Sequence, residues 1–412
     1  MLLDFSIIEK YISDNQDALK DRLMLRHERY KILATLQDKL QTLLENYNTF
    51  EKNISSRLFN KIEKATAYEK LRNYHFKSVE GIKEFYLNNH TIPDVHDLFR
   101  LVRDAITVRV LQLVEEEMKS QGLGLPPTEY VWIGLGSEGR DEQTLLTDQD
   151  NMIVYDTGNG QYGLDIIEQY YETFSKKAVD RLSDVGFEKC KGGVMPSNEK
   201  WRGSIQTWKK RLEDRLILEK GDFDDLDVII LTDARPMKGN SKLLDEVMTF
   251  FFSSLTDNTR IMKDFIKSAV LMPTAITFFG NFRVEKSGEY KDLLNIKLLG
   301  WAPLILSVRM LALSNGIYET NTLKRIRLMK EKGVIKKEME KNLTDAYLTF
   351  VNFRIMNQIE KSKDNNNNIS DANHIRPDML GQKAQEEMRR SMKSVEALQK
   401  YIEEVLLFGQ PI

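Results

Sequence analysis

The chain contains 412 residues, of which 41% are hydrophobic and 30% charged, a balance typical of a soluble globular protein with two or three domains. Its 60 basic and 62 acidic residues give a net charge of -2, so no basic excess indicates nucleic acid as a partner. The single cysteine, Cys190, excludes an internal disulfide and a cysteine-only zinc site. We expect a cytoplasmic location and no membrane span, since the apolar runs are judged too short to cross a bilayer.

The N-terminal part of the chain is predicted to be helical. Its first 80 residues contain neither glycine nor proline, which turns require. Apolar residues recur there at the spacings of an amphipathic helix, at Leu23, Leu33, Leu36, Leu40, Leu43 and Leu44. A helical hairpin, part of a bundle or a coiled-coil dimer would bury them. With a further helix over 92–121, we expect residues 1–125 to form a helical region that binds a second copy or another partner.

The character of the sequence changes after Pro126 and Pro127. Short apolar runs at 131–136, 152–155 and 228–231 predict strands, and the run 164–185 predicts a helix. Strands separated by helices predict an α/β domain with a mixed sheet over residues 126–242. A helical domain is expected over 243–412, with helices at 243–255, 259–271, 293–314, 322–332, 336–362 and 382–408. The polar run 364–368 is predicted to be a loop.

A glycine turn after the first predicted strand has the composition of a phosphate-binding loop. At Gly136 the backbone can approach an anion closely, and the Ser137 hydroxyl and the following amides can donate to phosphate oxygens. A helix beginning there would add a favourable field for phosphate. Arg140 offers a charged fork for the same group, and a position on a helix surface is the alternative interpretation.

Two aspartates at the entry to the second predicted strand are the candidate metal ligands. Alternation along a strand places Asp148 and Asp150 on one face and Gln149 on the other. Adjacent carboxylates repel each other unless a cation lies between them, and Mg²⁺ prefers carboxylate and phosphate oxygens. The pair therefore predicts phosphoryl or nucleotidyl transfer assisted by Mg²⁺ or Mn²⁺.

A two-metal mechanism needs a third carboxylate, and the third predicted strand offers two. Asp233, at its end, is expected to face the aspartate pair, to share in metal binding and to act as base for the attacking hydroxyl. Asp227, at its start, is the alternative. Asp224 and Asp225 are expected to be solvated loop charges.

Several segments carry a resemblance to a known family. They are residues 136–151 (GSEGRDEQTLLTDQDN), 190–204 (CKGGVMPSNEKWRGS), 233–239 (DARPMKG), 295–304 (NIKLLGWAPL) and 319–325 (ETNTLKR). These segments resemble the DUF294 family of nucleotidyltransferases, within the DNA polymerase β superfamily. That family is similar to the uridylyltransferase domain that modifies the PII nitrogen-signalling protein. The resemblance covers the chain from about Asp94 to its end.

The resemblance implies an α+β fold, mostly α overall, with a polymerase-β-like mixed sheet between the N-terminal helices and a C-terminal helical substrate-binding domain. It implies that Gly136 and Ser137 hold phosphate while Asp148, Asp150 and Asp233 hold metal. The implied reaction transfers a nucleoside monophosphate from a nucleoside triphosphate to a hydroxyl of an unidentified protein or small-molecule acceptor, in signalling or regulation. We expect the active cleft between the sheet and the C-terminal helices.

Two further groups of residues are candidates for the nucleotide pocket. A loop offers an aromatic ring for a base and polar groups for phosphate or ribose, at Ser197, Asn198, Lys200, Trp201 and Arg202. A structured loop packed on the sheet is the equal alternative. Lys297 and Arg309 are expected to face a ligand if they point inward, because burying an unpaired charge is costly. Cys190 is expected to be a small buried residue.

Two other functions stay open from the sequence. A non-catalytic regulatory or adaptor protein can keep this fold and its nucleotide site. A toxin–antitoxin or drug-modifying nucleotidyltransferase is the second alternative, with the N-terminal helices as its partner surface.

Overall fold

The structure, a computed structural model, describes residues 5–21, 23–51, 57–89, 91–158, 160–277, 280–363 and 371–407. The chain forms two compact units, Met1–Arg109 and Val110–Ile412. Helices dominate, and short strands form small sheets in the second unit, which confirms the mostly helical α+β class. The domain limits expected at 125/126 and 242/243 stay predictions. The loop predicted at 364–368 lies outside the described residues.

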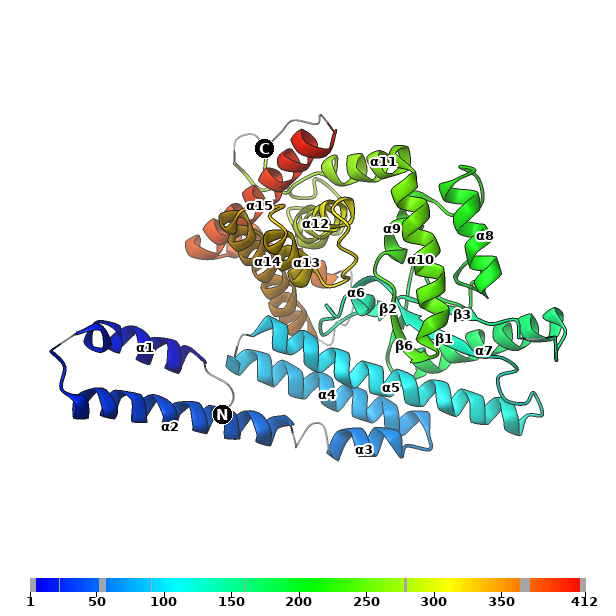
Figure 1. The fold of residues 1–412 in the computed structure, drawn as a ribbon, viewed down its shortest axis with the longest axis horizontal. Helices are drawn as coiled ribbons and strands as arrows, with labels where there is room; N and C mark the ends of the chain where they lie inside the picture. Colours follow the sequence, from blue (N-terminus) through cyan, green and yellow to red (C-terminus); the bar gives the residue numbers. More distant parts are fainter. Residues whose placement is uncertain are drawn as a thin grey trace. The chain divides into compact units, whose positions relative to one another are not determined.

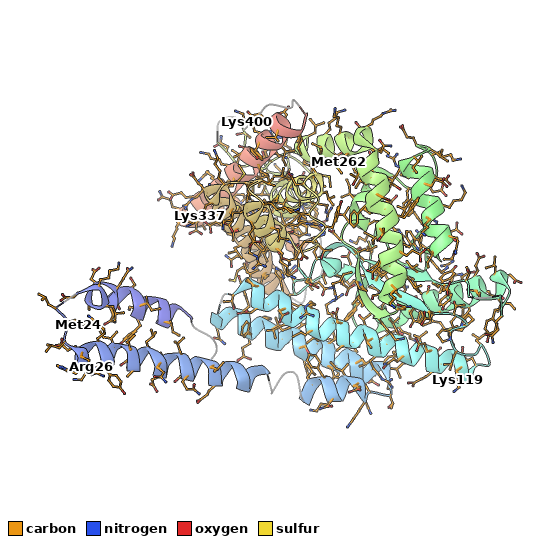
Figure 2. All side chains as sticks on the ribbon, in the orientation of Figure 1. Met24, Arg26, Lys119, Met262, Lys337 and Lys400 are labelled. Atoms are coloured by element: carbon orange, nitrogen blue, oxygen red, sulfur yellow. The ribbon has the colours of Figure 1, made fainter. Side chains whose placement is uncertain are left out.

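The first unit is helical throughout its described residues. Its elements are α1 (Phe5–Lys20), α2 (Arg26–Glu51), α3 (Arg57–Glu63), α4 (Tyr68–Asn89) and the first part of α5 (Ile92–Ser120). Leu33, Leu40 and Leu44 on α2 are 50%, 46% and 53% exposed, and side chains project from several sides of this helix (Figure 2). These three leucines of the predicted apolar stripe are thus exposed in the single chain, and binding of a second copy or another partner there stays a prediction.

A four-stranded mixed sheet lies in the second unit, in the order β5-β3-β1-β6. Its strands are β1 (Tyr130–Gly134), β3 (Asn151–Tyr155), β5 (Arg202–Ser204) and β6 (Arg235–Gly239). β1 is antiparallel to both β3 and β6, and β3 is parallel to β5. Every residue of β1 and β3 is buried, because helices pack on the sheet (Figure 1). These helices are α7 (Leu164–Asp184), α8 (Ile205–Leu216) and α10 (Ser241–Asp257).

The third predicted strand is wrong, because residues 228–231 lie in helix α9 (Asp225–Leu231). Asp224 caps this helix and forms a reciprocal capping box with Asp227, so local capping outweighs the β-branched run. The strand that pairs with β1 on the side opposite β3 is the later β6. Its Pro236 is tolerated because β6 forms an edge of the sheet. Asp225 is not a plain loop charge either, since it pairs with Arg215.

The C-terminal helices pack on one another (Figure 1), and all but α12 begin within a residue of their predicted positions. They are α11 (Thr259–Val270), α12 (Ala302–Ser314), α13 (Thr322–Glu331), α14 (Lys337–Lys363) and α15 (Gln382–Ile402), which continues into the short π-helix η6 (Glu403–Leu407).

The helix predicted from residue 293 begins later than expected. Strand β7 (Leu294–Asn295), which pairs with β8 (His374–Ile375), and a short π-helix, η3 (Lys297–Trp301), come before α12. Against the prediction, the run Lys297–Ser314 is long and apolar enough to cross a membrane. However, 67% of it is buried inside the fold, as in the core helix of a soluble protein. The cytoplasmic location stays a prediction.

Candidate active site

Asp148, Asp150 and Cys190 come together where two short strands lie side by side. β2 (Asp148–Gln149) is parallel to β4 (Glu188–Lys189), and Cys190 directly follows β4. Ligand atoms of the three side chains all lie within 4.8 Å of one another. The side chain of Gln149 is fully buried elsewhere, and its amide donates to two backbone carbonyls at 2.8 and 3.2 Å. The predicted alternation of the two aspartates around Gln149 is confirmed.

The Asp150 carboxylate lies against the glycine turn. Gly136 has a φ of +53°, and a Cβ built there would lie 2.4 Å from Asp150 Oδ2. The Leu135 backbone N–H donates to the Asp150 carbonyl at 2.7 Å, which holds the two segments together. Burial, followed by the Asp148 charge, raises the pKa of Asp150 to about 7. The turn and the aspartate pair therefore form one local unit, in which a cation would relieve carboxylate repulsion.

Replacement of Gly136 by alanine is expected to damage this unit. The left-handed backbone costs a non-glycine residue roughly 1–2 kcal/mol, and the new methyl must displace the Asp150 carboxylate. We expect a lower melting temperature and at least a roughly 10-fold loss of Mn²⁺ affinity, a factor worth about 1.4 kcal/mol. Titration calorimetry and thermal unfolding measure both effects.

Gly192→Ala is the matched control. Its added methyl would have Cys190 Sγ, 3.6 Å away, as its nearest neighbour, and Gly192 does not have a left-handed φ. Equal behaviour of Gly136→Ala and Gly192→Ala would show that the close approach at Gly136 has no importance for the site.

Asp233 belongs to a different cluster of charges. It is fully buried, and Oδ2 accepts hydrogen bonds from Arg140 Nη1 at 2.5 Å and from Arg309 Nη2. Oδ1 accepts from both Nη atoms of Arg325 at 3.4 Å. Among the described residues, Asp233 is not part of the group formed by the aspartate pair and Cys190. The structure therefore does not bring the expected third carboxylate to the pair, because the carboxylate compensates three buried guanidiniums.

Asp227, the alternative third carboxylate, is also engaged elsewhere. It completes the cap of α9 and forms an ion pair with Lys200. Neither aspartate of the expected third strand is therefore placed as a ligand beside Asp148 and Asp150.

Arg140 connects the glycine turn to the C-terminal helices. Its Nε donates to Glu142 Oε2 at 2.8 Å in addition to the bond with Asp233. Glu142 Oε1 accepts from the Thr322 backbone N–H at 2.6 Å, and the Asn321 side chain donates to the Arg140 carbonyl at 2.9 Å. The Arg140 guanidinium, which was expected to bind phosphate, is thus occupied by carboxylates of the protein. Its contacts hold the sheet domain against the C-terminal helices.

The loop proposed to contact a nucleotide base is packed on the sheet. Trp201 is 1% exposed and lies against Trp208 and Phe223, with ring centroids 6.3 and 5.7 Å away. Its ring is therefore not available to stack on a base. The polar neighbours of Trp201 also bond within the protein. Arg202 donates to the carbonyls of Pro196 and Ser197. Lys200 pairs with Asp227, and Asn198 caps the short helix η2 (Glu199–Trp201). These contacts favour the structured-loop alternative.

The two cations expected to face a ligand differ from each other. Arg309 is buried and satisfied in part by Asp233. Lys297, the first residue of η3, is half-buried, and its ammonium has no hydrogen bond or ion pair with any described residue. Burial, followed by the positive charge of Arg354, lowers its pKa, while Asp148 and Asp150 act in the opposite sense. Lys297 is thus the predicted cation that lies within electrostatic reach of the aspartate pair.

Three residues near the site were missed by the sequence analysis. Cys190 was taken as an ordinary buried residue, although it opens the family segment 190–204, which is the signal that marked it. Trp301 stands in the family segment 295–304. Arg354 lies inside the long helix α14, and no local pattern there distinguishes it from a surface charge.

The donor set fits a divalent cation such as Mg²⁺ or Mn²⁺. Two carboxylates supply the hard oxygen ligands that these ions prefer, and phosphate oxygens usually complete their coordination. The thiol of Cys190 is a weaker partner, because burial and then the Asp150 charge raise its pKa to about 12 and keep it protonated. Asp148 and Asp150 are therefore the residues suited to hold the ion.

Two family models match the chain. Residues 80–221, which contain the glycine turn and the aspartate pair, match "Putative nucleotidyltransferase DUF294". Residues 259–405, which contain Lys297 and Arg354, match "Putative nucleotidyltransferase substrate binding domain". No curated protein matches the chain. The chain is a member of the DUF294 family of nucleotidyltransferases and carries that family's C-terminal substrate-binding domain.

Proposed function

We propose that this protein transfers a nucleoside monophosphate from a nucleoside triphosphate to a hydroxyl of a protein or small-molecule acceptor, in a signalling or regulatory role. The observation that carries the proposal is the Asp148–Asp150 pair, whose carboxylates share one face beside the glycine turn. The pair follows a Gly136-Ser137 turn with the composition of a phosphate-binding loop. Membership of a nucleotidyltransferase family supports the same reaction class.

The residues of the chain have separate roles in this proposal. Asp148 and Asp150 would hold Mg²⁺ or Mn²⁺, which would supply positive charge to neutralise the triphosphate and its pyrophosphate leaving group. Gly136 keeps the backbone close to the Asp150 carboxylate, and Ser137 presents its hydroxyl, which lies 3.1 Å from that of Thr147. Rate enhancement then comes mainly from positioning and electrostatics, since phosphoryl chemistry needs little covalent help from the protein.

Asp233 supports the site from a distance in this scheme. Its hydrogen bonds with Arg140, Arg309 and Arg325 join the glycine turn to α12 and α13. It is therefore a positioning residue that holds the two domains of the site together, and not a base for the acceptor hydroxyl.

The proposal is tested by following the α-phosphate label of each nucleoside triphosphate into candidate acceptors with Mg²⁺ or Mn²⁺, and by identifying the products by mass spectrometry. Label transfer that depends on the metal and stops with EDTA is the expected result. Absence of triphosphate binding by the native chain, measured by titration calorimetry with either metal, would contradict the proposal. That result would favour a non-catalytic adaptor that keeps the fold.

A further inference from the structure

Arg354 on α14 is a buried guanidinium without a counter-ion. Only 7% of the surface of Arg354 is exposed to solvent. Its Nε has no hydrogen-bond partner, and no ion pair holds the group among the described residues. It lies over the Trp301 ring, 4.6 Å from the ring centroid. Buried cations are normally paired, because desolvating a charge is costly.

The three other buried arginines of this region each have a carboxylate partner. Arg140, Arg309 and Arg325 all donate to Asp233, and Arg140 also pairs with Glu142. Arg354 has no bond to either carboxylate, and the half-buried ammonium of Lys297 is likewise unpaired in the described part of the chain. Two cations of the C-terminal domain thus have no hydrogen-bonded or ion-paired anion among the described residues.

Contacts of α14 and η3 bring the segments that carry these two cations to the segment that precedes the aspartate pair. Gln358, one helical turn after Arg354 and so on the same face, donates to Thr144 Oγ1 at 3.0 Å and to the Leu146 carbonyl at 3.3 Å. Leu146 is two residues before Asp148. The same Trp301 ring that lies under Arg354 also lies under Arg140, 5.2 Å from its centroid, and Trp301 is one turn after Lys297 in η3.

The electrostatics agree with this placement. Burial lowers the pKa of both Arg354 and Lys297. The negative charge of Asp148 acts in the opposite sense on both groups, but more weakly. The Arg354 charge in turn is the second cause that lowers the pKa of Lys297. Two unpaired cations that repel each other, and that both interact with the carboxylates suited to hold the metal, would be stabilised by a bound polyanion.

We propose that Arg354 and Lys297 bind the β- and γ-phosphates of the nucleoside triphosphate, with Trp301 as the platform that holds the Arg354 guanidinium. This inference rests on the proposed function and assigns which substrate the C-terminal domain holds at this face. Asp148 and Asp150 would hold a divalent ion, and such an ion favours phosphate oxygens as further ligands, so the triphosphate is expected to bind at this face. An arginine fork suits phosphate oxygens because it can donate two parallel hydrogen bonds.

The charge interactions of the two cations favour a polyphosphate over an acidic group of the acceptor. The charge of Asp148 acts on both cations, and that of Asp150 acts on Lys297 as well, so an anion bound by the two cations would lie near the carboxylates suited to hold the metal. In nucleotidyl transfer the leaving pyrophosphate carries the greatest charge at that place. An acceptor held only by its own carboxylate or phosphate is the alternative source of the anion, and the test distinguishes the two.

The test compares Arg354→Met and Lys297→Met with the native full-length chain. Binding of tripolyphosphate with Mg²⁺, of a non-hydrolysable nucleoside triphosphate with Mg²⁺, and of a nucleoside monophosphate is measured by titration calorimetry. Each variant is expected to bind tripolyphosphate and triphosphate roughly 10- to 100-fold more weakly, the effect of losing a charge-assisted hydrogen bond. Monophosphate affinity should be unchanged.

Thermal unfolding without ligand separates binding from a structural role. Arg354→Met should melt at the native temperature or above it, because an unpaired buried charge is removed. A lowered melting temperature with unchanged tripolyphosphate affinity would show that Arg354 is structural and overturn the proposal. Lys297→Met, at a half-buried site, keeps the test decisive should Arg354→Met fail to fold.

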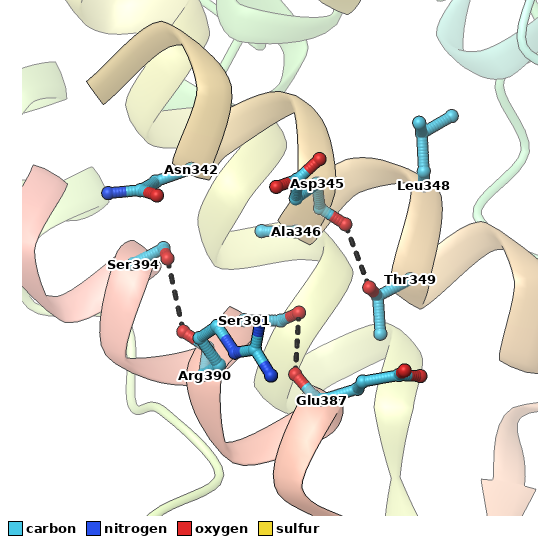
Figure 3. A pocket seen from close by; sticks show the side chains of 9 residues that line it. All are labelled: Asn342, Asp345, Ala346, Leu348, Thr349, Glu387, Arg390, Ser391 and Ser394. Atoms are coloured by element: carbon cyan, nitrogen blue, oxygen red, sulfur yellow. Dashed lines mark hydrogen bonds between the residues drawn. The ribbon is translucent and has the colours of Figure 1, made fainter. Parts of the chain in front are cut away.

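Arg390→Met is the matched control within the same domain. Arg390 is an exposed residue of α15 that lines a separate cavity of about 320 Å³ between α14 and α15 (Figure 3). This substitution should leave all three affinities unchanged, and an equal loss there would mean that general surface charge attracts the anion and that the proposed site is wrong.

The remaining outcomes separate this inference from the proposed function. Native transfer activity with undiminished triphosphate affinity in both variants would leave the function intact and overturn the inference. If only transfer to the acceptor fell in those variants, the cations would hold the acceptor, which also overturns it. Loss of tripolyphosphate binding in the variants supports the inference even where no transfer is detected. A native chain that binds no tripolyphosphate contradicts it.

Discussion

Asp150→Asn is expected to abolish nucleotidyl transfer while making the metal-free protein more stable above neutral pH. Burial and the Asp148 charge raise the pKa of Asp150 to about 7 in the folded chain, whereas an unperturbed aspartate titrates near pH ~4. Between these values the folded state holds a proton that the unfolded state has lost. The native protein therefore loses stability as the pH rises from about 4 through 7, by about 2 to 4 kcal/mol in all. Asparagine, which carries no charge, removes that loss.

Thermal unfolding in EDTA measures the stability effect. The variant should melt several degrees above the native protein at pH 8, and the difference should disappear as the pH falls to about 4. Mg²⁺ should raise the melting temperature of the native protein only, since binding to the folded state stabilises it. Transfer should fall by roughly a thousand-fold or more, because loss of metal binding removes several kcal/mol of charge stabilisation.

Asp165→Asn provides the control for this experiment. Asp165 is exposed in the first turn of α7, so its replacement should change neither transfer nor the response to Mg²⁺. The interpretation of Asp150 would be lost if the Asp150→Asn protein in EDTA melted below the native protein at pH 8, or if it kept native transfer.

Asp233→Asn is expected to have the opposite effect on stability. Its two oxygens accept hydrogen bonds from Arg140, Arg309 and Arg325, all of them buried. A neutral amide leaves three buried guanidiniums without their shared counter-charge. Removing one partner of a buried ion pair costs about 3–5 kcal/mol, so the variant should unfold at a much lower denaturant concentration or fail to accumulate as folded protein.

Asp225→Asn is the control for the loss of an aspartate–arginine pair. Asp225 pairs with Arg215, and its side chain is 43% exposed. A solvent-exposed pair contributes only about 0–1 kcal/mol, so this variant should unfold almost like the native protein. A well-folded Asp233→Asn protein that has lost metal binding would reverse our assignment and restore Asp233 as the third metal carboxylate.

The aspartate pair and the glycine turn were predictable from the sequence because their geometry is local. Strand alternation alone places Asp148 and Asp150 on one face of the strand and Gln149 on the other. The proximity of the two carboxylates and the buried amide of Gln149 confirm this arrangement. The close approach at Gly136 likewise involves residues only fourteen positions apart in the chain. The C-terminal helices were predictable for the same reason, since helical periodicity repeats within every turn.

The position of the last strand could not be predicted from local preference. The run Val228–Leu231 has the β-branched composition of a strand, yet Asp224 and Asp227 cap it as helix α9. The strand that pairs with β1 at the sheet edge, β6, contains Pro236, which counts against a strand until that edge position is known. Edge position is a property of the whole sheet, so residues 235–239 show no sign of it in isolation.

By itself, the amino-acid sequence determined most of the helices, though not α9, together with the family and the two aspartates suited to hold a metal ion. Only the tertiary structure decided which charges remain available for a ligand. Asp233 and Arg140 looked like site residues but compensate each other, while Arg354 looked like an ordinary helix charge and is left unpaired. The physical reason is that a charge is satisfied by whatever partner the fold brings to it. Here those partners stand 76 to 93 positions away from Asp233 along the chain.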